Sequence, residues 1–277
     1  MGNNNGACRK RDAAVMCPSF RATGDETHST RGRANTLRLA LTGQLGPTAF
    51  SSSEMAESMS LCVGCKACKR ECPTGVDMAR MKLESQASQT TAHGLSIGQR
   101  LVAYLPRYAP AVAGVGPLFN TVQKLPGATR CIEALTGFTR HRPLPHWHKS
   151  KRLNSITRTG PADGQPVAIL LDTFSRWFEP SNGEAMVNVL AGAGCRVHIA
   201  GADDKNPLCC GRTFLAAGLI DEARHEARRL LKAVKPFIDQ GIPLVGLEPS
   251  CLLTLRDEYD VLLPPSETKG LDRKSVV

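Results

Sequence analysis

Three short strand-like runs in the second half of the chain alternate with helical patterns. The runs are VAILL (167–171), RVHIA (196–200) and PLVGL (243–247), and the first is unbroken and apolar, as expected of a strand buried on both faces. Between them lie GEAMVNVLAGAG (183–194) and a long amphipathic stretch at 212–238. Apolar residues recur at helical spacing in the long stretch, which predicts one helix with a single stripe facing the sheet: Leu215, Leu219, Ala223, Ala227, Leu230, Leu231 and Val234. The order strand–helix–strand–helix–strand predicts an α/β domain with a parallel sheet and helical crossovers.

The first 90 residues have a different pattern, with two helical stretches and no strand-like run. One helix is expected near STRGRANTLRLALTGQL, with Ser29 or Thr30 as its N-cap, and the other near VDMARMKLESQ, with Asp77 in its first turn. We therefore expect a small α-helical domain before the α/β domain, so that the fold class is mixed.

A segment rich in proline and glycine separates these two regions. Its most apolar window, residues 101–119, is interrupted by Pro106, Pro110, Pro117 and Arg107, which argues against a lipid-exposed span. Short buried or interfacial helices are expected instead, an arrangement compatible with peripheral membrane association. The predicted organisation is a ferredoxin-like domain at 1–90, a helical linker region at 91–163, the α/β domain at 164–263 and a polar tail at 264–277.

The chain has more basic than acidic residues, 35 against 25. The 277 residues are 42% apolar and 5% aromatic with a formal net charge of +10, and basic residues cluster at 139–158. No nucleic-acid-binding motif accompanies them, so a solvated surface or an acidic protein partner is expected rather than a nucleic acid.

Four of the 11 cysteines lie close together, at Cys62, Cys65, Cys68 and Cys72, followed by Pro73. Disulfides at this density require an oxidising compartment, and the N-terminus has no apolar run typical of a signal peptide, so a cytoplasmic location is expected. Structural zinc sites usually separate two cysteine pairs by roughly 12 to 20 residues. The spacing C-x2-C-x2-C-x3-C-P is instead that of bacterial ferredoxins, and it predicts a 4Fe-4S cluster.

Three further cysteines follow strand ends of the predicted sheet. Cys209 and Cys210 come after the second run, and Cys251 comes after the third. Because the carboxyl ends of parallel strands meet at one edge of a sheet, these thiols are expected to lie close together and to bind a cofactor. The alternative is that they are small buried apolar residues.

These motifs carry a family resemblance over residues 3 to about 263. The strings LCCGRTFLAAGLIDEARHEARRLL, GLEPSCLLTLRDEY and LLDTFSRWFEP resemble the cysteine-rich CCG domain shared by the glycolate oxidase iron-sulfur subunit and heterodisulfide reductase. The string ACRKRDAAVMCPSFRATGDETHSTRGRANTLRLALTGQLG is similar to the C-terminal electron-transfer half of FAD-linked D-2-hydroxy-acid dehydrogenases of the D-lactate or D-2-hydroxyglutarate type. The resemblance implies that the chain is the iron-sulfur electron-transfer portion of an oxidoreductase. FAD and the 2-hydroxy-acid site are then expected in a partner flavoprotein or in a missing N-terminal portion.

The first cysteine run of such two-cluster domains is incomplete here. Cys8 and Cys17 remain, whereas Gly2 and Asn5 stand where earlier ligands are expected. In the ligand exchange of two-cluster ferredoxins, the fourth cysteine of each run serves the other cluster. Cys17 is then the fourth ligand of the cluster held by Cys62, Cys65 and Cys68, and Cys8 and Cys72 are left without a full second set. One cluster is expected; the alternative is that Cys72 closes the same cluster.

The CCG motif also departs from its pattern, because Thr254 occupies the position of a C-x2-C partner to Cys251 and only one repeat is present. Both departures favour a fragment of a longer protein. Basic residues around the thiols, Lys66, Lys69, Arg70, Arg31 and Arg33, either raise the cluster's reduction potential or are simply solvated. The function predicted is one-electron transfer to an unidentified acceptor, and the alternative is a non-catalytic zinc- or metal-binding structural module.

Overall fold

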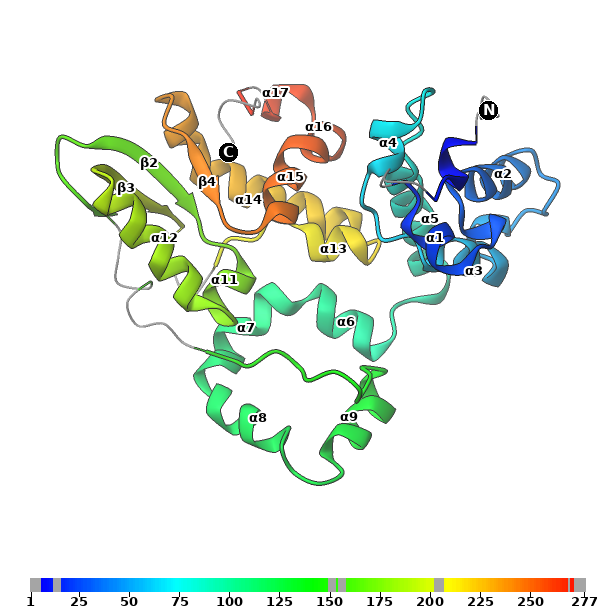
Figure 1. Cartoon of the computed structure of the whole chain (residues 1–277), viewed down its shortest axis with the longest axis horizontal. Helices are drawn as coiled ribbons and strands as arrows, with labels where there is room; N and C mark the ends of the chain where they lie inside the picture. The colour runs from blue at the N-terminus through cyan, green and yellow to red at the C-terminus, as the bar shows by residue number, and fades with distance from the viewer. Residues whose placement is uncertain are drawn as a thin grey trace. The chain divides into compact units, whose positions relative to one another are not determined.

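The computed structural model describes residues 6–11, 16–148, 153, 158–201, 207–268 and 270–271. The chain forms two compact units, and Figure 1 labels the helices and strands of both. The N-terminal unit comprises Met1–Leu95 with Ala216–Leu219, and the C-terminal unit comprises Ser96–Leu215 with Ile220–Val277.

The N-terminal unit is helical within its described residues. Its elements are η1 (Ala7–Arg9), α1 (Pro18–Thr23), η2 (Glu26–His28), α2 (Thr30–Leu41), η3 (Ala49–Ser51), α3 (Ser53–Ser60), α4 (Ala67–Glu71) and α5 (Met78–His93). Both helices predicted here are confirmed, as α2 and α5. Ser29 caps α2 by accepting a hydrogen bond from the Gly32 amide at 3.0 Å. Asp77 is itself the N-cap of α5 rather than a first-turn residue, since its carboxylate accepts from the Arg80 amide.

Sulfur-containing side chains make up much of the core of this unit. Met16, Met55, Met59 and Met78 are buried beside Phe20. Five of the cysteines belong to the same cluster or pack against it: Cys8, Cys17, Cys62, Cys68 and Cys72. The thiols of the N-terminal unit are therefore part of its packed interior or its edge rather than a separate surface feature.

The C-terminal unit contains a four-stranded sheet with strand order β1-β3-β2-β4. The strands are β1 (Arg158–Thr159), β2 (Gln165–Leu170), β3 (Cys195–Ala200) and β4 (Leu244–Gly246). The three predicted strands are confirmed as β2, β3 and β4, with β2 parallel to both neighbours. The sheet as a whole is mixed rather than parallel, because β1, which was not predicted, pairs with β3 in the antiparallel direction. Its two residues are too few to show any hydrophobic period.

Helices connect the parallel strands, as expected: α11 (Thr173–Trp177) and α12 (Pro180–Gly192) lie between β2 and β3, and α13 (Arg212–Ala216) and α14 (Ile220–Asp239) lie between β3 and β4. Three further helices follow β4: α15 (Pro249–Asp257), α16 (Tyr259–Leu262) and α17 (Pro265–Thr268). The prediction of one continuous helix at 212–238 is wrong, since α13 and α14 are separate. Gly218, between them, has a φ of 76°, a left-handed conformation that ends a helix. The predicted stripe survives on α14, where Ala223, Ala227, Leu230 and Val234 are buried.

Within residues 96–148, which the structure describes, the chain forms four short helices: α6 (Ile97–Ala103), α7 (Leu105–Gly114), α8 (Gly116–Val122) and α9 (Ala128–Thr136). The apolar window at 101–119 is thus divided among α6, α7 and α8. In the part of the chain that the structure describes, no helix combines the length and apolarity needed to cross a bilayer.

Candidate metal centre

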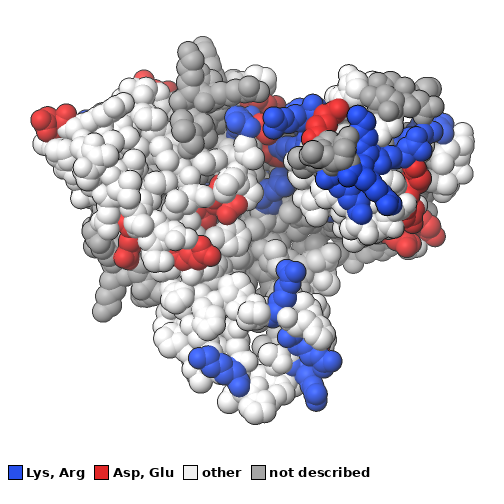
Figure 2. Space-filling view, in the orientation of Figure 1, with Lys and Arg blue, Asp and Glu red and all other residues white. Residues whose placement is uncertain are grey.

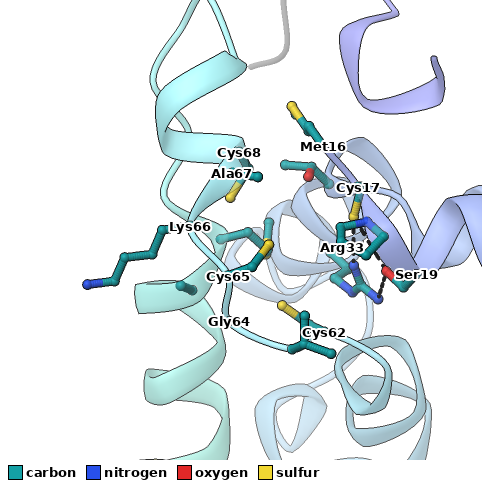
Figure 3. A pocket seen from close by; sticks show the side chains of 15 residues that line it. Met16, Cys17, Ser19, Arg33, Cys62, Gly64, Cys65, Lys66, Ala67 and Cys68 are labelled. Carbon is teal, nitrogen blue, oxygen red and sulfur yellow. Dashed lines mark hydrogen bonds between the residues drawn. The ribbon is translucent and has the colours of Figure 1, made fainter. Parts of the chain in front are cut away.

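The cysteine loop of the N-terminal unit turns sharply between Cys62 and α4. Gly64 has a φ of 65°, and Lys66, the N-cap of α4, has a φ of 58°. Both values lie in the left-handed region, where glycine is tolerated and lysine is uncommon. The turn directs three thiols toward one space, as Figure 3 shows for Cys62, Cys65 and Cys68.

A fourth thiol reaches the same space from a distant part of the sequence. Cys17 is the N-cap of α1, and Pro18 occupies the first helical position. Its sulfur faces the three thiols of the loop in Figure 3. The cavity between them is lined by Met16, Cys17, Pro18, Ser19, Thr30, Arg33, Cys62, Val63, Gly64, Cys65, Lys66, Ala67, Cys68, Met78 and Ala79. Two segments about 45 residues apart in sequence therefore supply four thiols to one cavity.

Cys72 does not line this cavity. It is the C-cap of α4, and its thiol lies 3.1 Å from the hydroxyl of Thr74. Cys8 is buried in η1, within the same sulfur-rich core. Gly2 and Asn5, where earlier ligands were expected, lie outside the described residues. The structure thus brings Cys17 together with Cys62, Cys65 and Cys68, and it places Cys8 and Cys72 apart from that group.

A buried arginine, Arg33, lies next to Cys17. Arg33 has no exposed surface, and its guanidinium donates to the Ser58 carbonyl at 2.7 Å and to the Ser19 hydroxyl at 3.0 Å. Its Nη1 lies 3.6 Å from the Cys17 sulfur. Among the described residues no carboxylate pairs with Arg33. Because an uncompensated buried charge is strongly unfavourable, the counter-charge expected here is an anion in the cavity, namely the Cys17 thiolate and whatever it binds.

The surroundings of these thiols affect their ionisation in different ways. Burial opposes ionisation of Cys17, but hydrogen bonds from Ser19 and Thr30 and the Arg33 charge bring its pKa below the ordinary value for a thiol. Burial raises the pKa of Cys68, partly offset by the backbone amides of Met78 and Lys69. Cys17 is therefore better prepared than Cys68 to be a thiolate before any metal binds.

The other basic residues named from the sequence are less close. Arg31 and Arg70 are exposed, and Lys69 pairs with Asp77 at 3.5 Å. Lys66 lines the cavity, whereas Lys82, which sequence reasoning missed, donates to the Cys62 carbonyl. Ser19 and Thr30 were missed as well, because nothing in a hydroxyl residue's local sequence indicates a neighbouring thiol. Figure 2 shows Lys and Arg side chains gathered over part of this unit, whose exposed basic residues include Arg9, Lys10, Arg11, Arg31, Arg38, Lys69 and Arg70.

The four thiols line a cavity and do not converge on the position of a single metal ion. Ligands of a single tetrahedral zinc ion lie about 2.3 Å from the metal, so their sulfurs lie close together. Within the described ranges, no three His, Cys, Asp or Glu side chains converge closely enough to hold one metal ion. A 4Fe-4S cluster has its iron atoms at the corners of a cube, and its cysteine ligands are correspondingly farther apart. The donor set, the shared cavity and the buried cation fit such an anionic cluster.

The second group of cysteines lies in the C-terminal unit. Cys209 and Cys210 precede α13, and Cys251 lies in the first turn of α15, after β4. All three are buried, and the sulfur of Cys210 lies 3.2 Å from that of Cys251. The sulfur of Cys209 accepts a hydrogen bond from the Gly211 amide at 3.3 Å. The structure therefore brings together two loops that follow parallel strands; cofactor binding at these thiols stays a prediction.

A buried phenol and a buried carboxylate affect this second set of thiols. The phenol of Tyr259, which is fully buried, donates to the Cys210 carbonyl at 3.1 Å. The pKa of Cys209 is raised well above its ordinary value by its hydrogen bond with Cys210, by burial and by the negative charge of Glu226. The pKa of Cys210 is also raised well above the ordinary value; one thiol contact, with Cys209, lowers it, but the contact with Cys251 and burial outweigh that effect.

Comparison with known proteins identifies the cofactor of the N-terminal unit. Residues 3–76 match the sequence model of the 4Fe-4S dicluster domain family. The chain is 30% identical over 278 residues to a probable glycolate oxidase iron-sulfur subunit of Bacillus subtilis, covering 89% of this chain and 57% of that protein. It is 25% identical over 317 residues to D-2-hydroxyglutarate dehydrogenase of Pantoea ananatis, covering 97% of this chain and 30% of that protein.

A shorter similarity extends to a third kind of protein. Over 159 residues the chain is 25% identical to one subunit of the anaerobic glycerol-3-phosphate dehydrogenase of Escherichia coli, covering 56% of this chain and 39% of that protein. No solved structure matches the chain. The chain spans 30% of the length of the Pantoea dehydrogenase and 57% of the Bacillus subunit. It is thus an iron-sulfur protein with a 4Fe-4S-type N-terminal region, homologous to part of D-2-hydroxyglutarate dehydrogenases and of the glycolate oxidase iron-sulfur subunit.

Proposed function

We propose that the N-terminal unit holds one 4Fe-4S cluster through Cys17, Cys62, Cys65 and Cys68 and transfers single electrons. The observation that carries this proposal is the cavity into which these four thiols project, with the buried Arg33 beside Cys17. The first 95 residues contain six cysteines, whereas two complete thiolate sets require about eight. Cys8 and Cys72 cannot complete a second set alone, so the proposal is for one cluster.

The bound cluster would supply one-electron redox chemistry. The residues of the chain set the conditions for it. The thiolates would hold the iron, and the positive charge of Arg33 would offset the negative charge of the site. Because the reduced cluster is more negative than the oxidised one, this positive charge would raise the reduction potential. Ser19 accepts from Arg33 and thereby fixes the guanidinium beside Cys17. Met16 and Met78 line the cavity and exclude water, whereas Cys65 is exposed and marks the side from which an electron partner has access.

We propose that the electrons come from a flavin-dependent 2-hydroxy-acid dehydrogenase and pass to a further acceptor. The similarity to D-2-hydroxyglutarate dehydrogenases and to the glycolate oxidase iron-sulfur subunit supports this assignment. FAD and the hydroxy-acid site then belong to a flavoprotein domain or subunit. The same similarity supports a ferredoxin-like arrangement at 1–90, a single CCG repeat at 164–263, and the linker and tail at 91–163 and 264–277. The reduced thiols that a cluster requires support a cytoplasmic location.

We further propose that the chain associates peripherally with a membrane surface. Apolar side chains are exposed along α6 to α9, at Ile97, Val102, Val115, Leu118, Phe119, Val122, Leu125 and Leu135. Exposed Lys124 and Arg130 lie in the same stretch, so an anionic bilayer surface complements it. Flotation of the protein with anionic but not zwitterionic vesicles would support association; equal recovery in the unbound fraction with both would exclude it.

The function is tested by electron uptake. The full-length chain, prepared without oxygen, is titrated with a strong reductant while visible absorbance and low-temperature electron paramagnetic resonance are recorded. We expect about one electron per chain and a paramagnetic signal that appears on reduction. Uptake of two electrons in two steps would contradict the single-cluster proposal, and a colourless protein that takes up none would contradict electron transfer itself.

A further inference from the structure

The buried thiols of the C-terminal unit do not form a ligand set of the kind found around the cavity of the N-terminal unit. Cys210 contacts both other thiols: its sulfur lies 3.2 Å from that of Cys251, and it hydrogen-bonds with Cys209. Of these two contacts, the one with Cys251 joins residues that are far apart in sequence. Thr254, the residue in the C-x2-C position relative to Cys251, is buried and donates its hydroxyl to the Ser250 carbonyl one turn earlier, at 2.7 Å. Its oxygen is engaged within its own helix, so it does not replace a missing thiolate.

The charges around this pair also disfavour an anionic metal cluster. Glu226 is almost fully buried and raises the pKa of Cys209 by its negative charge. The carboxylate of Glu226 is itself paired with two guanidinium groups, those of Arg229 at 2.6 Å and Arg107 at 3.2 Å. Arg212 pairs with Glu258 at 3.1 Å. Neutral thiols suit such surroundings better than several thiolates do.

We propose that Cys210 and Cys251 form a redox-active dithiol that closes reversibly to a disulfide. The sulfurs must approach by little more than 1 Å to reach the bond length of about 2.05 Å. They come from different elements, the loop before α13 and the first turn of α15, so closure links the two loops that follow β3 and β4. This inference does not depend on the proposed function, because it concerns residues of the other unit.

The oxidant is a low-molecular-weight disulfide, such as oxidised glutathione. One protein thiolate attacks it, forms a mixed disulfide and releases one small thiol. The second protein thiol then attacks the mixed disulfide and releases the other. In total two protein thiols lose two protons and two electrons and form one sulfur–sulfur bond, while the small disulfide is reduced to two thiols.

The third thiol provides a matched control. Cys209 is adjacent to Cys210 in sequence and equally buried, yet its sulfur accepts from the Gly211 amide. If proximity in the folded state selects the pair, replacing Cys209 should leave the disulfide intact. If any buried thiol of this loop can form the bond, Cys209 should form the disulfide with Cys251 in the Cys210→Ser variant.

The experiment exposes the full-length chain, prepared without oxygen, to glutathione buffers of increasing oxidised fraction. Free thiols are then alkylated, and tryptic peptides are analysed by mass spectrometry. We expect a cross-link between the peptides 206–212 and 233–256 that forms in the wild type and in Cys209→Ser. It should fall to background in Cys210→Ser and Cys251→Ser and disappear on reduction with dithiothreitol.

Several outcomes would overturn the proposal. They are the absence of the cross-link from the wild type at the most oxidising ratio, its persistence in Cys210→Ser, and loss of bound iron or zinc on Cys251→Ser, which would indicate metal ligation. Circular dichroism checks that each variant is folded, and Cys251→Ala replaces Cys251→Ser if the latter does not fold.

Discussion

The two cysteine groups of this chain differ in their electrostatic surroundings more than in their composition. In the N-terminal unit, Cys17 lies beside the buried Arg33, and its pKa is below the ordinary value. In the C-terminal unit, a hydrogen bond with Cys210 and burial, with a smaller contribution from the charge of Glu226, hold the pKa of Cys209 well above the ordinary value. The surroundings of Cys17 favour a thiolate, which binds iron, whereas those of Cys209 favour a neutral thiol. Cysteine spacing therefore identifies candidates, and burial, hydrogen bonds and neighbouring charge together distinguish the chemistries that they support.

The largest expected effect distinguishes Cys17 from Cys72. Cys17→Ser removes a thiol that lines the cavity, so we expect loss of nearly all bound iron. Cys72→Ser should retain it, because Cys72 lies outside the cavity beside Thr74. Iron is measured per chain after anaerobic reconstitution, with the exposed Cys131→Ser as the control. Retention of iron by the first variant and loss by the second would show that Cys72 closes the cluster.

The difference in thiol reactivity between positions in the C-terminal unit should also be large. Cys209 and Cys210 are buried and have raised pKa values, whereas Cys131 on α9 is exposed. Only thiolates react with iodoacetamide at useful rates, so near neutral pH we expect labelling at 209 and 210 to be at least about tenfold slower than at 131. Time-resolved labelling followed by peptide mass spectrometry measures both rates in one sample. Equal rates would contradict the neutral, enclosed environment.

A smaller effect is expected on the cluster's reduction potential. Arg33→Gln removes the buried positive charge beside Cys17, so the potential should fall by tens of millivolts, where about 59 mV corresponds to a tenfold change in a one-electron equilibrium. Arg33→Lys retains the charge and should give a smaller shift. Anaerobic potentiometric titration compares the three proteins. An unchanged potential in Arg33→Gln would mean that this charge is not coupled to the cluster.

The smallest effect concerns stability at alkaline pH. Cys209, Cys210 and Tyr259 all have folded-state pKa values well above the ordinary ones. Above pH of about 8.5 to 10 the unfolded chain loses protons that the folded chain retains, so the free energy of unfolding should decrease as pH rises. Both tryptophans, Trp147 and Trp177, lie in the C-terminal unit, so urea unfolding followed by their fluorescence reports on it. A rising free energy between pH 7.5 and 9.5 would contradict this reasoning.

Much of the architecture could be predicted from the sequence, because it depends on local patterns. The apolar run VAILL indicates β2, the alternation of short runs with helical patterns indicates β3 and β4, and Ser29 is a typical N-cap. Strand β1 could not be found, since two residues carry no period, and its pairing with β3 depends on tertiary structure. The break between α13 and α14 could have been suspected from Gly218, but the apolar stripe continues across it in sequence.

The candidate site shows the same limit. Spacing alone indicated Cys62, Cys65 and Cys68, and the ligand exchange of two-cluster ferredoxins indicated Cys17, although which cysteine completes the set is still a prediction. Arg31 and Arg33 are both basic and two positions apart, yet one is exposed and the other is fully buried. Which of the two side chains is buried depends on how α2 is rotated about its own axis where it packs against the core. The 3.2 Å approach of Cys210 to Cys251 likewise depends on how two loops meet, which no local pattern encodes.

Metal and sulfide analysis tests the central claim most directly. The full-length chain is reconstituted without oxygen, freed of unbound metal and assayed for iron, zinc and acid-labile sulfide. Four thiols around one cavity predict about four iron atoms and about four sulfides per chain, with negligible zinc. One zinc per chain without sulfide, or no stable metal at all, would contradict the account.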